Sequence, residues 1–347
     1  MLRKDDREAV QTSAQEVILA LALSYLPSRG LHVANELSIA DFLRDGPRSI
    51  EELARATGVH QQSLYRLLRM LAGFGVFAEE SPGRFQLTSS SAALITGVPD
   101  SLHDAVKMLG DMIGDGSWWT AAGYLDHSVR TGEPAFDHVH ATSFFEYLGR
   151  HREASRWFDR GLANFAIPEN AAIVSAYDFT PFRKIVDVGG GQGGFLAAVL
   201  SAYPSAFGTL YDRDTVVAEP AHLITAGLID RCEVVAGDFF ESVPPGGDVY
   251  ILKRILHDWN DQRCTEILRT CRSAMDAKAR ILVVDAVVPS GNEPHPSKVM
   301  DILMMLLVEG RERTEGEFRE LFQLAGLKLT RIVATPSVLS IIEGERA

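Results

Sequence analysis

Apolar residues recur three and four positions apart through the first half of the chain, which is the spacing of helices with one buried face. The clearest runs cover residues 16–26, 39–43 and 64–71. After about residue 170, short runs of β-branched and aromatic residues alternate with helix-like segments. This alternation predicts a mostly parallel sheet with helices on both faces. The pattern thus predicts a mainly helical domain over residues 1–170 and an α/β domain over residues 171–347.

Residues 49–87 carry the signals of a winged helix-turn-helix. Ser49 is followed three residues later by Glu52, which predicts a capping box at the start of a helix. A second helix is expected over residues 61–74. Residues 77–87 have the pattern of a hairpin that turns at Pro82 and Gly83. Because winged helices often bind DNA, this segment raises the question of a nucleic-acid partner.

Charge argues against that partner. The chain has 34 basic and 46 acidic residues, a formal net charge of -12, which opposes the counterion release that drives DNA affinity. The second helix of the motif offers only Arg66 and Arg69 as basic residues. We therefore expect a dimer-forming unit with no nucleic-acid partner, and the apolar residues between 14 and 40 favour a subunit contact. A ligand-sensing DNA regulator is kept as a remote alternative.

Seven segments of the second half are predicted to be strands. They cover residues 185–188, 208–211, 233–235, 249–252, 281–284, 327–334 and 338–343. Only the short turn at Thr335 and Pro336 joins the last two, which predicts an antiparallel hairpin at the edge of the sheet. Ligands of such sheets bind at the carboxyl ends of the parallel strands.

The composition and the first residues indicate in which compartment of the cell the protein is expected. The chain is 46% hydrophobic and 23% charged, as in ordinary globular proteins. None of its three cysteines forms a C-x-x-C pair, which fits a reducing cytoplasm. The first ten residues lack an apolar core, and the apolar run over residues 17–26 is too short to cross a bilayer. We expect neither a signal peptide nor a membrane partner.

A glycine-rich segment, DVGGGQGGF over residues 187–195, follows the first strand of the second half. Gly189, Gly191 and Gly194 satisfy the dinucleotide pattern G-x-G-x-x-G. Asp187 with Gly189, Gly191 and Gly193 also satisfies an acidic D-x-G-x-G-x-G pattern. The glycines alone do not distinguish the two cofactor classes.

The charge of Asp187 favours one of them. A carboxylate just before the first glycine is unfavourable beside a pyrophosphate, but favourable near the sulfonium and ammonium of S-adenosylmethionine. Asp212, at the end of the next strand, can accept from ribose hydroxyls in both classes. Asp238 and Phe239 follow the third strand, where they suit an adenine amine and ring. An NAD-dependent oxidoreductase remains the competing enzyme class.

The fourth strand leads into the sequence LKRILHDWN around His257. Together with VDVGGG at 186–191 and ERTEGEF at 312–318, this segment resembles the plant caffeate and bacterial antibiotic-pathway O-methyltransferase family, which includes hydroxyindole methyltransferases. The resemblance covers nearly the whole chain. It implies a class I fold dependent on S-adenosylmethionine, with a Rossmann-like seven-stranded methyltransferase sheet, a homodimer built on the N-terminal domain, and no metal.

The resemblance also assigns residues. The family's cofactor positions are matched by Gly189, Asp212, Asp238, Phe239 and Lys253, to which the loop adds Asp187 and Gly191. His257 matches the general base, and Asp285 and Glu312 match the two acids that flank it. Two departures stand out: Asp285 is one methylene shorter than the usual glutamate, and Arg213 and Asp214 replace the Leu-Pro usual after the ribose acid.

The chemistry explains these residue types. Methyl transfer is an in-line displacement with an excellent leaving group, so the enzyme must mainly align the acceptor and remove its proton. An unperturbed pKa near 6.5 would leave His257 largely neutral at pH 7 and able to accept that proton. A carboxylate at the other ring nitrogen would fix the tautomer, which is the role expected of Asp285 and Glu312.

In the family, the acceptor lies between the two domains. Candidate walls of its pocket are Met108, Trp118, Phe145, Phe158, Leu162, Met304 and Met305. Thioethers and aromatic rings suit a planar, largely apolar acceptor that carries a hydroxyl.

The sequence therefore predicts a cytoplasmic O-methyltransferase that acts on an aromatic small molecule of secondary metabolism, such as an antibiotic or pigment precursor, and releases S-adenosylhomocysteine. A carbon or nitrogen methyltransferase, or a non-methylating enzyme that binds the same cofactor, is the alternative within the same fold.

Overall fold

A computed structural model describes residues 13–98 and 100–347. The chain forms two compact units, one that ends at Met112 and one that begins at Ile113. This division falls before residue 170, where the change of sequence pattern placed it, because residues 113–176 belong to the same compact unit as the strands. The assignment of residues 1–170 to one functional domain stays a prediction.

The first unit is helical apart from one small sheet, as predicted. Its elements are α1 (Ala14–Leu23), α2 (Tyr25–Glu36), α3 (Ile39–Phe42), β1 (Arg48–Ser49), α4 (Ile50–Thr57), α5 (Gln61–Gly73), β2 (Phe77–Ser81), β3 (Arg84–Leu87), α6 (Ser89–Ala92) and α7 (His103–Gly110). The sheet has the order β1-β3-β2 and is antiparallel throughout. Phe77 and Phe85 on these strands pack against Leu64 and Leu68 of α5 in one core.

The winged helix-turn-helix is confirmed. The Ser49 side chain accepts from the Glu52 backbone while the Glu52 side chain accepts from the Ser49 backbone, which is the predicted capping box. The β2–β3 turn contains Gly83 at a φ of 75°, a left-handed conformation that suits glycine. Its amide donates to Glu79 Oε1 at 2.7 Å, so the turn is fixed from within the hairpin.

Apolar side chains remain exposed on α1. Ile18, Leu19 and Leu21 keep 65%, 61% and 66% of their surface accessible. Together with α2, the helix makes a 23-residue stretch, Ala14–Glu36, with a mean hydropathy of 1.4 in its most apolar window, 17% of which is buried. By length and composition this stretch could cross a membrane. A single helix of this kind near the N-terminus does not by itself indicate a membrane span, so the expectation of no membrane partner stays a prediction.

The second unit begins with helices and continues as an α/β sheet. Its helices are α8 (Ser117–Ala122), α9 (Leu125–Thr131), α10 (Ala135–His140), α11 (Phe144–Arg150), α12 (Arg152–Ala176), α13 (Gly194–Ala202), α14 (Asp214–Val217), α15 (Ala221–Thr225), α16 (Asp261–Ala274), α17 (Pro296–Leu307) and α18 (Glu315–Leu324). Two 3-10 turns are η1 (Ile229–Arg231) and η2 (Leu256–Asp258). Its strands are β4 (Lys184–Val188), β5 (Phe207–Asp212), β6 (Cys232–Ala236), β7 (Val249–Lys253), β8 (Arg280–Ala286), β9 (Leu327–Ala334) and β10 (Leu339–Arg346).

The seven strands form one sheet in the order β6-β5-β4-β7-β8-β10-β9. Strands β4 to β8 are parallel, and β10 pairs antiparallel with both β8 and β9, which confirms the C-terminal hairpin. Within that hairpin β9 forms the edge, and β10 is enclosed. Strands β5 and β6 are added on one side of β4, and β7 and β8 on the other side. This change of side makes a switch point at the carboxyl ends of the central strands, where ligands of such sheets bind.

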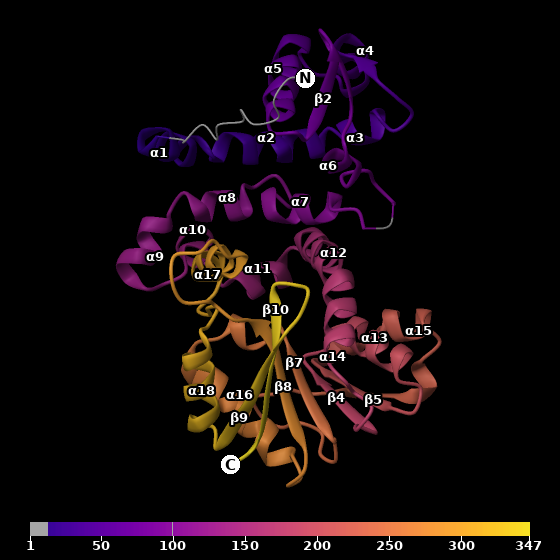
Figure 1. The fold of residues 1–347 in the computed structure, drawn as a ribbon, viewed down its shortest axis with the longest axis vertical. Coiled ribbons are helices and arrows are strands. Elements are labelled where there is room, and N and C mark those ends of the chain that lie inside the picture. The colour runs from indigo at the N-terminus through magenta and orange to yellow at the C-terminus, as the bar shows by residue number, and fades with distance from the viewer. Residues whose placement is uncertain (1–12, 99) are drawn as a thin grey trace, which may run out of the picture. The chain divides into compact units, whose positions relative to one another are not determined.

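Helices cover both faces of the sheet, as Figure 1 shows. On one face, α16 and α18 pack onto Tyr250, Ile281 and Val283. On the other face, the end of α12 and all of α13 pack onto alternate residues of the same strands, such as Val249, Ile251 and Leu282. Both faces of the central strands are thus apolar, which explains why these strands appear as continuous hydrophobic runs.

Candidate functional site

The glycine loop leaves β4 and turns into α13. Gly189, Gly191 and Gly193 have φ values of 73°, 60° and 82°, so three positions need the left-handed region that favours glycine. The Gly189 amide donates to Tyr211 O at 2.7 Å, which joins the loop to the end of β5. A side chain at Gly189 would lie 2.4 Å from Ile255, whereas one at Gly191 would meet open space. The loop is therefore closely packed at its first glycine and accessible at its third.

Asp187 lies beneath this loop. It is 1% exposed, and its Oδ2 has no hydrogen-bond partner among residues 13–98 and 100–347. Burial raises its pKa to about 7, an effect that the nearby Lys253 ammonium opposes. A buried carboxylate oxygen that lacks a partner suits a cationic group better than a pyrophosphate, so the donor set fits a positively charged cofactor.

The ends of three strands converge on the loop. Asp212, at the end of β5, accepts from the Gly191 amide through Oδ2 at 2.9 Å. Phe239, after β6, places a ring carbon 3.5 Å from the position that a Gly189 side chain would take. Asp238 is exposed, and its Oδ1 accepts from the Phe240 amide at 2.8 Å. Asp212 and Phe239 thus border the same glycine loop, and Asp238 directly precedes Phe239.

Lys253, at the end of β7, is engaged by a residue that the sequence reasoning missed. Its Nζ lies 3.2 Å from Oε2 of Glu169, a buried residue of α12. Glu169 also accepts from Arg254, which has a left-handed φ of 53°. The only sequence signal was an acid within a long helix pattern, beside Pro168. Glu169 therefore orders the two cations that follow β7.

The glycine loop also borders a cavity of about 480 Å³. Gln192 of the loop and His222 of α15 line it together with Arg156, Trp157 and Arg160 of α12. This cavity leaves space beside the glycine loop.

His257 lies in η2, directly after β7, and is 8% exposed. Its Nδ1 lies 3.0 Å from Oε1 of Glu312, whose carboxylate accepts the ring proton. That contact fixes the tautomer and leaves Nε2 as the second ring nitrogen. Nε2 lies 3.5 Å from Oδ1 of Asp258. Asp258 does not cap the next helix, because the Asn260 side chain fills that role by accepting from the Arg263 amide.

Asp285, at the end of β8, does not bond to His257. It is 1% exposed, and within the described part of the chain neither of its oxygens has a hydrogen-bond partner. The shorter side chain noted in the sequence is consistent with this difference. Burial raises the pKa of Asp285 to about 6, with the positive His257 opposing and Glu312 adding to the rise. Glu312 bonds to Nδ1 of the imidazole, whereas Asp285 acts on the ring only through charge.

The carboxylates around His257 change its charge. Burial alone would lower the imidazole pKa, but Asp258, Glu312 and Asp285 together raise it to about 9. The expectation of a largely neutral ring at pH 7 started from an unperturbed pKa, whereas these carboxylates shift the pKa upward and favour the protonated ring.

Most of the predicted acceptor residues gather in the second unit. Trp118 of α8 and Phe145 of α11 contact Phe144, at ring centroid distances of 6.0 and 5.6 Å, and Phe158 of α12 lies 5.3 Å from the same ring. Phe144, which the sequence reasoning missed, is the buried centre of this aromatic cluster.

The remaining predicted acceptor residues lie on three helices. Leu162 is 39% exposed on α12. Met304 and Met305 are half-buried on α17, which packs against α8 and α10. Met108 belongs to the first unit, where it is buried in α7.

Across the residues that the structure describes, no group of three or more His, Cys, Asp or Glu is arranged to hold a metal ion.

The fold and the site define a class of protein. A parallel sheet with an enclosed last strand, an acidic glycine loop and an acid at the end of β5 are the features of S-adenosylmethionine-dependent methyltransferases, as the sequence predicted. A family profile described as an O-methyltransferase domain matches residues 122–328, and one described as an O-methyltransferase dimerisation domain matches residues 19–97. The chain belongs to this O-methyltransferase family.

Relatives and solved structures agree with that membership. A phenazine O-methyltransferase of Lysobacter antibioticus is 42% identical over 340 residues, which cover 98% of each chain. An 8-amino-8-demethylriboflavin N,N-dimethyltransferase of Streptomyces davaonensis is 36% identical over 319 residues, 90% of each chain. A neocarzinostatin-pathway O-methyltransferase, solved with S-adenosylmethionine and 2-hydroxy-5-methyl naphthoic acid, has a TM-score of 0.79 at 33% identity and covers 93% of this chain and 96% of its own.

Proposed function

We propose that this enzyme transfers a methyl group from S-adenosylmethionine to a hydroxyl of an aromatic small molecule in antibiotic or pigment biosynthesis, with His257 as the general base. The observation that carries the proposal is the buried pair of His257 Nδ1 and Glu312 Oε1, 3.0 Å apart at the carboxyl end of the sheet. This pair fixes the ring so that Nε2 is the nitrogen that accepts the acceptor's proton.

The cofactor residues follow from the same edge of the sheet. S-adenosylmethionine supplies an electrophilic methyl group on a cationic sulfur, which suits the unpartnered carboxylate oxygen of Asp187. Asp212 would hold the ribose hydroxyls, and Asp238 with Phe239 the adenine. Gly189 and Gly191 would allow close backbone approach, and Lys253 would balance the charge of Asp187.

The acceptor class rests on the aromatic cluster of Trp118, Phe144 and Phe158 and on the methionines of α17. Flat rings and thioethers favour a planar, largely apolar acceptor. The phenazine and naphthoic acid named for two similar proteins belong to this class.

Together with Glu312, Asp285 stabilises the positive charge that His257 carries after it takes the proton.

The atom that receives the methyl group decides between two functions. A relative named as an N,N-dimethyltransferase favours nitrogen as the second candidate. Purified protein would be incubated with methyl-labelled cofactor and matched pairs of aromatic acceptors that differ only in carrying a hydroxyl or an amine. We expect label on the oxygen of the hydroxylated member. Label on nitrogen or carbon, or cofactor turnover without label transfer, would reject the proposal.

We propose that the enzyme is a cytoplasmic homodimer. The match to a dimerisation domain and the exposed apolar residues of α1 support a subunit contact there. The three cysteines, all in the described ranges, are free thiols, which fits a reducing compartment.

The raised pKa of His257 predicts a pH dependence. A base must be neutral to accept a proton, so kcat/KM should rise with pH until the histidine pKa of about 9 is passed. Asp285→Asn removes one of the charges that raise this pKa, and we expect the rise to occur at lower pH in that variant. A pH series of kcat/KM with one phenolic acceptor measures the shift. Because the acceptor's own ionisation is the same for both enzymes, an identical profile would contradict the charge role of Asp285.

A further inference from the structure

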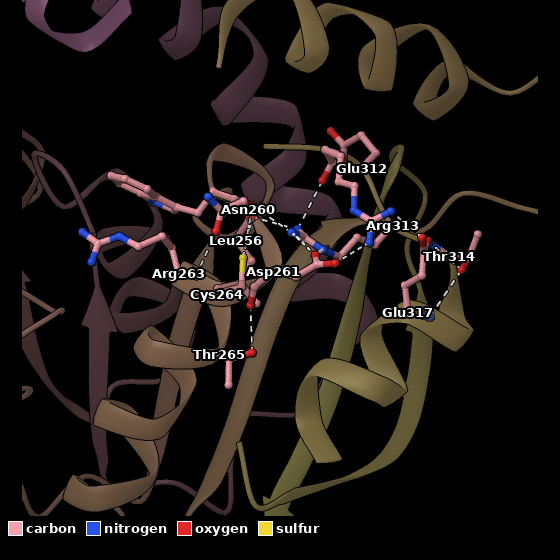
Figure 2. Close-up of polar contacts among 12 residues, drawn as sticks. Leu256, Asn260, Asp261, Arg263, Cys264, Thr265, Glu312, Arg313, Thr314 and Glu317 are labelled. Carbon is pink, nitrogen blue, oxygen red and sulfur yellow. Dashed lines mark hydrogen bonds and ion pairs between the residues drawn. The ribbon is translucent and has the colours of Figure 1, made fainter. Parts of the chain in front are cut away.

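Arg313 holds the backbone on both sides of His257. The residue is fully buried, at 0% exposure. Its Nη1 donates to the Leu256 carbonyl at 2.9 Å, and its Nη2 donates to the Trp259 carbonyl at 2.7 Å. One carbonyl precedes the histidine and the other follows it by two residues. Figure 2 shows the guanidinium between the turn at Leu256 and the start of α16.

The same guanidinium joins this turn to α16. Nε and Nη2 donate to Oδ1 of Asp261, the first residue of that helix, at 3.0 and 2.9 Å. Burying a guanidinium is costly unless its donors are satisfied, and here they bind two flanking carbonyls and a carboxylate. A planar fork of fixed geometry can serve these partners together, whereas the single ammonium of lysine cannot.

The backbone of Arg313 is fixed as well. Its carbonyl accepts from the Val288 amide at 2.8 Å, two residues beyond the end of β8. Glu312, the preceding residue, accepts from His257 Nδ1. Gly310 lies so close to the turn that a side chain there would meet the His257 carbonyl at 1.9 Å. Gly310, Glu312 and Arg313 therefore contact the His257 turn through backbone, carboxylate and guanidinium respectively.

We propose that Arg313 is a positioning residue, which holds the Leu256–Trp259 turn so that the His257 ring keeps its contact with Glu312. The inference rests on the proposed role of His257 as base. Arg313 touches neither ring nitrogen and acts only through the backbone that carries the ring.

The test compares Arg313→Met with Arg311→Met. Arg311 is the matched control, because it also binds Asp261, through Oδ2, but is half-exposed. Its other partner in the described part of the chain is Glu317 and not the carbonyls beside His257. For Arg313→Met we expect kcat to fall at least ten-fold, while the KM for S-adenosylmethionine changes less than two-fold. Arg311→Met should behave like the parent enzyme.

The pH profile separates positioning from charge. A looser Glu312 contact lowers the pKa of His257, so the rise of kcat/KM should move to lower pH in Arg313→Met. Loss of a nearby positive charge alone would move it to higher pH. A shift to higher pH, or an unchanged profile, overturns the inference.

Two further variants keep the test decisive. If Arg313→Met does not fold, Asp261→Asn replaces it, because it weakens the contact between the Arg313 guanidinium and a half-exposed carboxylate. The pH profile of kcat/KM should then move to lower pH by a smaller amount. An unmoved profile overturns the inference. His257→Ala is assayed in parallel. If it retains full turnover, the proposed base is wrong; if it loses turnover while the Arg313 profile is unchanged, only the positioning role is wrong.

Discussion

Replacing His257 with alanine is expected to lower kcat by about 10²- to 10⁴-fold, the range that general-base assistance typically contributes. Because His257 is itself protonated below its pKa of about 9, the fold-loss should be nearly constant below that pH and should shrink above it, where a phenolic acceptor ionises by itself. Because the proposed cofactor residues lie around the glycine loop and His257 is not among them, the dissociation constant of S-adenosylmethionine should change little. Steady-state kinetics and titration calorimetry on the same preparation measure both quantities.

The control for this variant is His60→Ala. His60 is an exposed residue that precedes α5 in the first unit, so its loss should leave kcat unchanged. Parent-like turnover of His257→Ala at every pH would mean that alignment of the acceptor carries the reaction without a base.

The second large effect is expected from Gly310→Ala. An added methyl group would lie 1.9 Å from the His257 carbonyl oxygen and 2.4 Å from the Asp258 carbonyl carbon, so backbone must move. Overpacking of this kind typically costs about 1–3 kcal/mol of folding free energy. A displacement of the catalytic turn by about 1 Å can lower turnover about 10²-fold. Thermal unfolding and kcat of the purified variant test the two consequences separately.

Gly316→Ala is the matched control for that change. Gly316 lies in α18, where a methyl group would approach no atom closer than 3.9 Å. Alanine is favoured over glycine in helices by about 0.5–1 kcal/mol, so this variant should be as stable as the parent or more so and equally active. Equal behaviour of the two variants would show that the close approach at Gly310 does not constrain the turn.

The pattern of the sequence predicted the elements of the sheet closely. The strand over residues 327–334 has the predicted bounds, and the helix predicted over residues 61–74 is α5, Gln61–Gly73. Such elements are encoded locally, by apolar periodicity and by capping residues. The family and its enzyme class were likewise predicted, from motifs of contiguous residues around Asp187, His257 and Glu312, and are confirmed.

What the sequence did not predict depends on contacts between distant residues. Glu169 meets Lys253 across 84 positions, and Arg313 meets Leu256 across 57. The pKa of His257 is raised by its neighbour Asp258 and by Glu312 and Asp285, and the last two reach it from other segments of the chain. No periodicity marks such pairs, because each side chain is ordinary in its own helix or loop. Only the geometry of the buried site shows that Glu312 bonds to the His257 ring, whereas Asp285 acts on the ring through charge.

The enclosed position of β10 has a consequence for how the protein is made. Ser340 of this strand pairs with Asp285 of β8, so residues that follow β8 by more than 50 positions form its neighbour in the sheet. While the ribosome still holds residues 339–346, β8 has an open edge and β9 has no partner to join. The nascent polypeptide can therefore pair the five parallel strands early, but it cannot cover the edge of β8 until translation has passed β10.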